Sequence, residues 1–236
     1  MSKDDPARSR DAYHHGDLRN ALVDAAVSLV VAKGAEGFSL REAARAVGVS
    51  PAAAYRHFAD KDALLAAVAF AGFRRLARSM RAAAARKSRS GDVRVRAAAA
   101  FAAVGEAYVE FAVEQPSLFR VMFGPWCQLA QGLPEEMNEE DDPYLGLVQI
   151  LDGLVAVGVI PAERRAGAEL PSWSMVHGFA SLLVEKGIEL TPAERSASNA
   201  NLARTVLLGL GCDPALVPPP RRPPPGLTHP HDRKAC

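Results

Sequence analysis

The segment spanning residues 39–65 constrains the fold of this chain more than any other, because it holds several helix-start signals and a turn within a short stretch. Ser39 and Glu42 have the spacing of a capping box, in which a hydroxyl and a carboxylate each satisfy a backbone amide at a helix start. A short amphipathic helix is expected to follow, because apolar residues recur at the helical spacing i, i+3, i+4, i+7. This apolar stripe consists of Leu40, Ala43, Ala44 and Val47.

A glycine turn and a second helix start come next. Gly48 can adopt the positive φ that turns a chain sharply after a helix. Ser50 and Pro51 suit the N-cap and the first position of a second helix over residues 51–58, and Asp60 can cap a third. Two short helices joined by such a turn are a helix-turn-helix, whose second helix lies in the major groove of DNA. The alternative is a helical hairpin with ordinary polar side chains.

The sequence around this segment, residues 13–69, resembles the TetR family of transcriptional regulators. The resemblance implies an all-α protein with an N-terminal three-helix helix-turn-helix DNA-binding domain and a C-terminal helical domain for ligand binding and dimerisation. The alanines at 52–54 leave few side chains to read bases directly, and Ala54 stands where many members carry a larger apolar residue. The motifs that carry the resemblance are YRHFADKDALL at 55–65, YHHGDLR at 13–19, PSLFRVMFGP at 116–125 and WSMVHGFASLL at 173–183.

The predicted DNA-binding surface combines groups that suit different parts of a duplex. Hydroxyl, imidazole and ammonium groups suit phosphate oxygens, whereas a guanidinium suits guanine and methyl groups suit thymine. We assign phosphate contacts to Ser39, Tyr55, His57 and Lys61. We assign the base-facing surface at the second helix to Ser50, Ala52, Ala53 and Arg56, and we include Pro51 among the DNA-binding residues.

The composition favours the all-α class. About half of the chain is apolar (49%), only 6% is aromatic, and no alternating run indicates a strand. No apolar stretch is long enough to span a bilayer, and the polar N-terminus does not resemble a signal peptide. Three cysteines that are far apart fit a reduced compartment. We therefore expect a cytoplasmic protein without a membrane partner.

The near-neutral net charge of +1 hides an asymmetry between the two parts of the chain. Residues 1–96 carry 18 Lys and Arg against 10 Asp and Glu, and the remaining residues carry 10 against 17. A basic first part suits a protein that presents one end to phosphates. Much of the excess, however, lies between Arg74 and Arg96, beyond the helix-turn-helix. We interpret this run as a solvated face and loop rather than a second DNA site.

The predicted organisation has four parts. We expect a disordered polar arm over 1–12, in which Arg8 and Arg10 could reach DNA, and a first helix from Gly16 to Lys33. A helical second domain includes an acidic linker at 134–143 and a capped helix start at Thr191, Pro192 and Glu194. The predicted boundaries are a DNA-binding domain over 13–72, a regulatory and dimerisation domain over 73–212, and a Pro-rich disordered tail over 213–236.

The last two predicted helices are the candidates for self-association. A helix-turn-helix that reads a two-fold operator usually acts as a dimer, because one recognition helix contacts too few bases. The resemblance implies that this pair of helices forms the dimer interface; the alternative is that both stripes are buried inside one subunit. The predicted stripes are Val176, Phe179, Ala180, Leu183 and Val184 on one helix, and Leu202, Val206, Leu207 and Leu210 on the other.

Large and polarizable side chains in the second domain predict a pocket, although aromatic residues at helical spacing more often pack in a core. Ligand sites are mostly apolar with a few polar groups. The resemblance implies a small-molecule inducer without identifying it. The predicted ligand-binding residues are Tyr108, Phe111, Phe119, Met122, Phe123, Trp126, Trp173 and His177.

The sequence lacks the common enzyme motifs GxSxG, HExxH, GxGxxG and the P-loop. We expect no cofactor and no metal, since His229, His231 and Cys236 could bind an ion only adventitiously. The expected function is a homodimeric repressor that a small apolar ligand releases from a palindromic operator. Two alternatives are an activator or partner-dependent regulator without a ligand, and a ligand-binding or enzymatic domain whose helix-turn-helix is vestigial.

Overall fold

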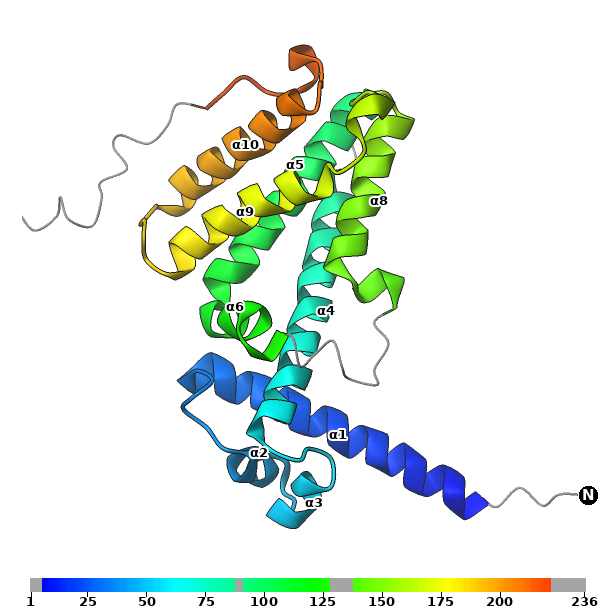
Figure 1. The fold of residues 1–236 in the computed structure, drawn as a ribbon, viewed down its shortest axis with the longest axis vertical. Helices are drawn as coiled ribbons and strands as arrows, with labels where there is room; N and C mark the ends of the chain where they lie inside the picture. Colours follow the sequence, from blue (N-terminus) through cyan, green and yellow to red (C-terminus); the bar gives the residue numbers. More distant parts are fainter. Residues whose placement is uncertain (1–5, 88–90, 128–137, 222–236) are drawn as a thin grey trace, which may run out of the picture. The chain divides into compact units, whose positions relative to one another are not determined.

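All regular structure in the described part of the chain is helical (Figure 1), which confirms the predicted all-α class. The structure is a computed structural model that describes residues 6–87, 91–127 and 138–221, with residues 6–17, 86 and 87 described by their helical backbone alone. The chain divides into two compact units. The first comprises Met1–Phe73 and Gln115–Glu136, and the second comprises Arg74–Glu114 and Met137–Cys236.

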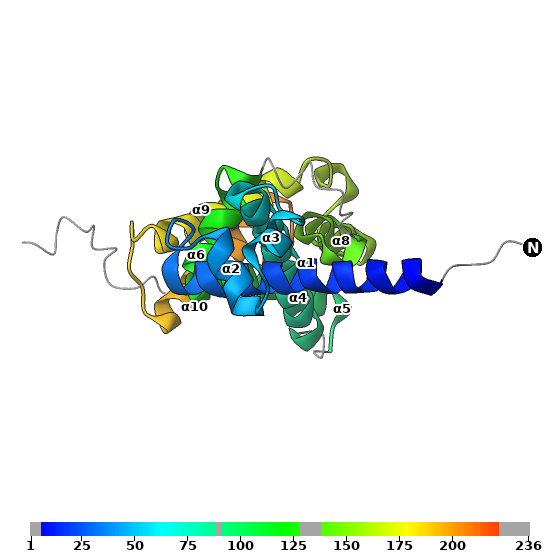
Figure 2. The same ribbon diagram turned by 90° about the horizontal axis from the view of Figure 1, so that it is seen from below.

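The first unit is built on α1 (Pro6–Lys33), α2 (Leu40–Val47), α3 (Pro51–Tyr55) and α6 (Pro116–Phe123), together with the start of α4 (Lys61–Lys87). The helix α2 packs against both α1 and α3 (Figure 2), and α6 packs against α1. The buried side chains come from every one of these helices and from the turn before α4. They include Leu22, Ala26, Val30, Phe38, Leu40, Ala54, Phe58, Leu64, Leu65, Leu118 and Met122.

The first helix begins at Pro6, ten residues before the predicted start at Gly16. The predicted disorder of residues 6–12 is therefore wrong, and only residues 1–5 of that arm lie outside the described residues. Proline suits the first position of a helix because its fixed φ is already helical and it has no N–H to satisfy. The arginines and alanines that follow Pro6 are good helix formers, and the helix continues through Gly16 to Lys33.

The predicted domain boundary after residue 72 also needs correction, because α6 belongs to the first unit. Gly72 of α4 lies so close to Met122 of α6 that a Cβ at this position would come within 2.6 Å of the methionine Sδ. The rings of Phe73 and Phe123 meet edge to face, with their centroids 5.3 Å apart. This packing is long-range in sequence, so no local pattern around residue 72 could have revealed it.

The second unit is arranged around α5 (Val93–Glu114), against which α8, α9 and α10 each pack (Figure 1). Its apolar core joins buried residues of α5, α8 and α10, among them Phe101, Leu151, Leu154, Ala203 and Leu207, and the half-buried Met175 of α9 packs against it. The three helices that pack on α5 are α8 (Pro143–Ala156), α9 (Glu169–Val184) and α10 (Pro192–Gly209). The unit also contains residues 74–87 of α4 and the 3₁₀ helices η1 (Glu139–Asp141), η2 (Ala162–Arg164) and η3 (Pro214–Leu216).

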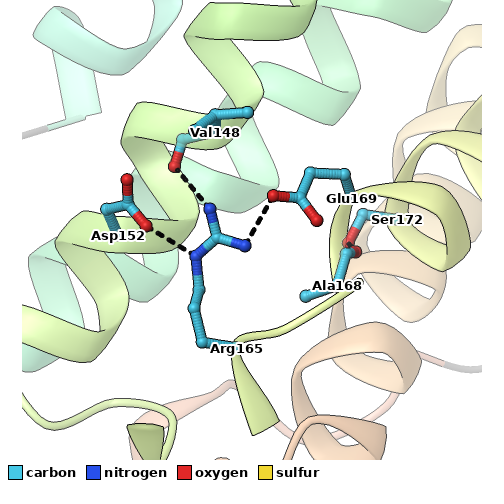
Figure 3. A network of polar contacts seen from close by, with 6 residues as sticks. All are labelled: Val148, Asp152, Arg165, Ala168, Glu169 and Ser172. Atoms are coloured by element: carbon cyan, nitrogen blue, oxygen red, sulfur yellow. Dashed lines mark hydrogen bonds and ion pairs between the residues drawn. The ribbon is translucent and has the colours of Figure 1, made fainter.

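Arg165 joins α8 to α9 through a network of polar contacts (Figure 3). Its Nε donates to Asp152 Oδ1 at 2.6 Å, and its Nη1 donates to Glu169 Oε1 at 2.6 Å. Nη2 reaches the carbonyl oxygen of Val148 at 3.5 Å. The hydrogen bond from Arg165 holds the pKa of the Glu169 carboxyl below its ordinary value. A guanidinium with donors on both edges is suited to hold two helices at once.

The predicted acidic linker contains ordered structure over its described residues, 138–143, the last of which begins α8. Asp141 in η1 approaches Arg78 of α4, with 3.5 Å between the carboxylate Oδ1 and Nε. Asp142 caps α8, because its Oδ1 accepts from the backbone N–H of Tyr144 at 2.7 Å and of Leu145 at 3.3 Å. Residues 134–137 of the linker lie outside the described residues.

The predicted disorder of the tail is wrong for residues 213–221. The 3₁₀ helix η3 begins directly after Asp213, and Leu216 and Val217 are buried in the core of the second unit. The prolines of this segment suggested disorder, but two adjacent apolar residues supply a hydrophobic anchor that composition alone does not reveal. Residues 222–236, which include His229, His231 and Cys236, lie outside the described residues.

Candidate nucleic-acid interface

The two short helices α2 and α3 are each started by a serine, as predicted. Ser39 Oγ accepts from the N–H of Glu42 and Ser50 Oγ accepts from the N–H of Ala53, both at 3.2 Å. Pro51 occupies the first turn of α3. Such caps satisfy amides that have no partner within the helix.

Of the two hydrogen bonds of the predicted capping box at Ser39, the bond from the Glu42 N–H to the serine hydroxyl forms. The carboxylate of Glu42 does not return to the N-cap but forms a short ion pair with Lys33 of α1. This pairing lowers the pKa of Glu42, chiefly through the hydrogen bond from the lysine. A lysine nine residues earlier in the chain lies outside the range of a capping motif, which is why the sequence pattern did not predict it.

Gly48 makes the turn between α2 and α3 with φ of +79°. Its N–H donates to the carbonyl of Arg45 at 3.1 Å, and the N–H of Val49 donates to that of Ala44 at 3.0 Å. These bonds satisfy carbonyls at the end of α2 in a conformation that side chains with a Cβ adopt only with strain.

The α-helical part of α3 ends at Tyr55, earlier than the predicted end at Phe58. The N–H groups of His57 and Phe58 still bond to the carbonyl of Ala54, both at 3.0 Å, so the chain continues to turn as far as Phe58. Ala54 and Phe58 are buried and attach this short element to the core of the first unit.

The opposite side of α3 is open to solvent. Tyr55 has 47% of its surface exposed, and Arg56 is also exposed. Of the other predicted DNA-binding residues, Ala53, His57 and Lys61 are half-buried, and the exposed ones are Ser39, Ser50, Pro51 and Ala52. The helix therefore presents a hydroxyl, a guanidinium and small side chains outward, as a groove-reading helix requires.

Lys61, a predicted phosphate contact, has partners within the chain. Its Nζ lies 3.7 Å from Glu36 Oε2 and donates to the Glu36 carbonyl at 3.4 Å. The same ammonium lies 5.3 Å from the centre of the Phe38 ring. A phosphate at this position has to compete with the Glu36 carboxylate for the lysine.

Sequence reasoning missed two exposed cations on α2, Arg41 and Arg45. They are four residues apart and lie away from the buried residues Leu40, Ala43 and Ala44. This i, i+4 spacing on the polar side of the helix was visible in the sequence. Both guanidinium groups suit phosphate oxygens.

The eight predicted ligand residues are divided equally between the two units. In the first unit, Phe119 and Met122 are buried, the Phe119 and Phe123 rings have centroids 4.8 Å apart, and Trp126 Nε1 donates to Asp62 Oδ1 at 2.8 Å. Asp62 lies in the first turn of α4, so this bond ties the segment after α6 to the helix that follows the predicted DNA-reading element.

In the second unit, three of the predicted ligand residues form one hydrogen-bonded group. Tyr108 Oη lies 2.8 Å from His177 Nδ1, and Trp173 Nε1 donates to the same hydroxyl at 3.4 Å. Burial raises the pKa of Tyr108 and lowers that of His177, so both groups favour their neutral forms. Phe111 is buried on α5.

The predicted dimer stripes lie partly inside the single chain. Ala180 and Leu207 are 0% and 1% exposed, and Val184 and Val206 are also buried. These four side chains turn inward because α9 and α10 both pack on α5. The other five are half-buried, namely Val176, Phe179, Leu183, Leu202 and Leu210.

A different face of α9 points outward. Leu170 and Leu182 are 65% and 51% exposed, and Ser174 and Gly178 between them complete a stripe at i, i+4, i+8 and i+12. On α10 the corresponding outward side includes Ser198, Leu202, Thr205 and Gly209, which are exposed or half-buried. None of these eight residues carries a charge.

A capped short helix that follows a glycine turn and presents its polar side to solvent from a small helical unit defines a helix-turn-helix DNA-binding protein. Comparison with family models agrees with this class. Residues 22–68 match bacterial regulatory proteins of the tetR family, and residues 101–206 match the tetracyclin repressor-like C-terminal domain. The chain belongs to the TetR family of transcriptional regulators, which are DNA-binding regulators and not enzymes.

Several individual proteins are similar to this chain. The chain is 26% identical over 174 residues to an uncharacterized HTH-type transcriptional regulator, YobS, from Bacillus subtilis, covering 74% of this chain and 83% of that protein. A solved protein of unknown function from Rhodococcus sp. RHA1 is 31% identical with a TM-score of 0.64, covering 84% of this chain and 97% of its own. A TetR family regulator from Marinobacter aquaeolei VT8, 21% identical, shares the fold with a TM-score of 0.53 over 84% and 97% of the two chains.

Among the helices that the structure describes, none combines the length and the hydropathy of a membrane-spanning segment.

Proposed function

We propose that this protein is a homodimeric, sequence-specific repressor that binds a palindromic operator in the cytoplasm and is released from it by a small apolar ligand. The observation that carries the proposal is the outward face of α3, where Tyr55 and Arg56 are exposed while Ala54 and Phe58 hold the element on the core. A short helix fixed on one side and open on the other is what readout of base edges in the major groove requires.

The contacts to DNA divide into two kinds. Arg56 reads guanine, and the methyl groups of Ala52 and Ala53 contact thymine, with Ser50 beside them at the helix start. Tyr55, His57 and Ser39 contact phosphates, together with Arg41 and Arg45 on α2. Lys61 joins them by exchanging the Glu36 carboxylate for a phosphate.

The proposed dimer forms through the outward faces of α9 and α10. The eight outward residues carry no charge and include the exposed side chains of Leu170 and Leu182, which a second copy would cover. The half-buried members of the predicted stripes, such as Phe179 and Leu202, lie beside this face and add to the contact. Two copies placed about a two-fold axis would present two α3 helices to the two halves of a palindrome.

The proposed ligand binds in the second unit next to the Tyr108, Trp173 and His177 group. These side chains supply a hydroxyl, an indole N–H and an imidazole among apolar neighbours, which is the usual make-up of a small-molecule site. A ligand acts by binding more tightly to the state that does not fit the operator. The second candidate is a DNA-binding activator or partner-dependent regulator with no small ligand.

The experiment that tests the DNA-binding surface compares two arginine variants after selection of bound fragments from the source genome. Arg56→Ala should lose the preference at one base pair of the selected site, at a cost of about 1–3 kcal/mol in binding. Arg81→Ala, an exposed position in the basic run on α4, is the matched control and should bind as the unmodified chain does. If Arg56→Ala kept the base preference of the unmodified chain, the assignment of α3 as the DNA-recognition helix would be wrong.

A thermal-shift screen with apolar and aromatic compounds separates the two candidate functions. A ligand that binds only the folded protein raises the melting temperature in proportion to RT ln(1 + [L]/Kd). The same compound should weaken operator binding. Stabilising compounds that leave operator affinity unchanged would favour the regulator without an inducer.

A further inference from the structure

Residues 213–221, named here the strap, follow α10 and return along its surface. Asp213 Oδ1 accepts from the N–H of Ala215 at 2.9 Å and starts the turn. Leu216 and Val217 then enter the core of the second unit, which anchors the strap at its beginning. Pro218, Pro219, Pro220 and Arg221 are exposed.

Two side chains of α10 hold the exposed end of the strap. Arg204 Nη1 donates to the carbonyl oxygens of Pro218 at 2.7 Å and Val217 at 3.3 Å. The side-chain amide of Asn201 forms two hydrogen bonds with the backbone of Arg221. Its Nδ2 donates to the carbonyl oxygen and its Oδ1 accepts from the N–H, each at 2.9 Å. The three prolines have no backbone N–H, so this run leaves no donor without a partner.

The strap crosses the outward side of α10. The buried residues of this helix are Asn199, Ala203, Val206 and Leu207. Asn201 projects from the opposite side, since two residues turn a helix by about 200°. The proline run therefore lies on the same side of α10 as Ser198 and Thr205, which belong to the proposed self-association face.

We infer that the strap is part of the self-association surface, where the Pro218–Pro220 run contacts a second copy of the chain. The inference rests on the proposed homodimer. Proline fixes the backbone φ already in the free protein. An ordered proline run therefore loses little conformational entropy when it packs against a partner. The three prolines carry no charge and lie on the same side of α10 as the uncharged Ser198 and Thr205, with Arg221 following them at the exposed end of the strap.

The decisive test compares two variants, one with a negative charge on the proline run and one with a negative charge elsewhere on the strap. Pro219→Glu should raise the dimer dissociation constant about tenfold in sedimentation equilibrium, because a charge would be buried without a partner. Ala215→Glu, exposed in η3, is the matched control and should dimerise as the unmodified full chain does. Both variants should keep the melting temperature of the unmodified chain at concentrations where each is monomeric. Equal dissociation constants for the two variants would overturn the inference.

A second variant tests the attachment itself. Asn201→Ala removes both bonds to Arg221, so the Arg221 amide should exchange faster with solvent and the dimer should weaken. Faster exchange with an unchanged dissociation constant would overturn the inference. A full chain that stays monomeric would instead refute the homodimer, which distinguishes failure of the proposed function from failure of the strap's role.

Discussion

The α2–α3 region and the contacts of α5 with α9 and α10 differ in the sequence distance over which their polar contacts act. In the α2–α3 region, Ser39 and Ser50 each bond to an amide three residues away, and Gly48 turns the chain between them. In the second unit, by contrast, Tyr108 and His177 are 69 residues apart, and Glu110 and Arg195 are 85 apart. The reading helix is thus shaped by local signals, whereas the proposed ligand site exists only when distant helices meet. We expect local changes to act on DNA binding and long-range changes to act on the packing of α5, α9 and α10.

The largest effect on the free energy of unfolding is expected when the ion pair between α5 and α10 is removed. Arg195 Nε and Nη2 donate to the two oxygens of Glu110 at 2.7 and 2.6 Å. Arg195→Ala should lower the free energy of unfolding by about 2–3 kcal/mol, because it leaves a partly buried carboxylate without its partner. Chemical denaturation measures the loss, with Arg94→Ala as an exposed control that should change stability by less than about 0.5 kcal/mol. Equal stability of the two variants would mean that the long-range pair does not hold these helices.

A smaller and more local effect is expected at the start of α3. Ser50→Ala should cost about 1 kcal/mol, because it removes the oxygen that accepts from the Ala53 N–H. Hydrogen exchange should speed up at Ala53 while amides of α5 keep their protection. Ser50→Asp is the matched control, since aspartate also caps helices and should restore protection. If α5 amides lost protection as well, the separation between local and long-range determinants would not hold.

The smallest effect concerns acid sensitivity at the α8–α9 junction. The pKa of Glu169 is lowered, chiefly by the hydrogen bond from Arg165. A lowered folded-state pKa contributes stability that is fully present above the ordinary value of 4.5 and is lost as pH falls through the lowered value. Glu169→Gln should therefore have a shallower loss of stability below pH 4.5 than the unmodified chain. Identical slopes in pH-dependent melting curves would show that solvent screens this pair completely.

Several features could be predicted from the sequence because they depend on neighbours within one or two helical turns. The caps at Ser39, Ser50 and Asp60, and the capping box at Thr191 and Glu194, all form as predicted, apart from the diverted carboxylate of Glu42. The tail prediction failed because local composition does not show what a distant core can accept. Proline-rich sequence indicated disorder, yet the core of the second unit buries Leu216 and Val217.

The sequence by itself determined the helical class, the turn at Gly48, and the exposed chemistry of Tyr55 and Arg56, because caps, φ preferences and helical periodicity act over a few residues. Only the tertiary structure decided which faces of α9 and α10 turn inward and that α6 joins the first unit. It also decided that Tyr108, Trp173 and His177 share one hydroxyl. The physical reason is that an apolar stripe on a helix predicts that this face is buried but does not identify the helix that covers it. The covering helix is decided only when the helices pack.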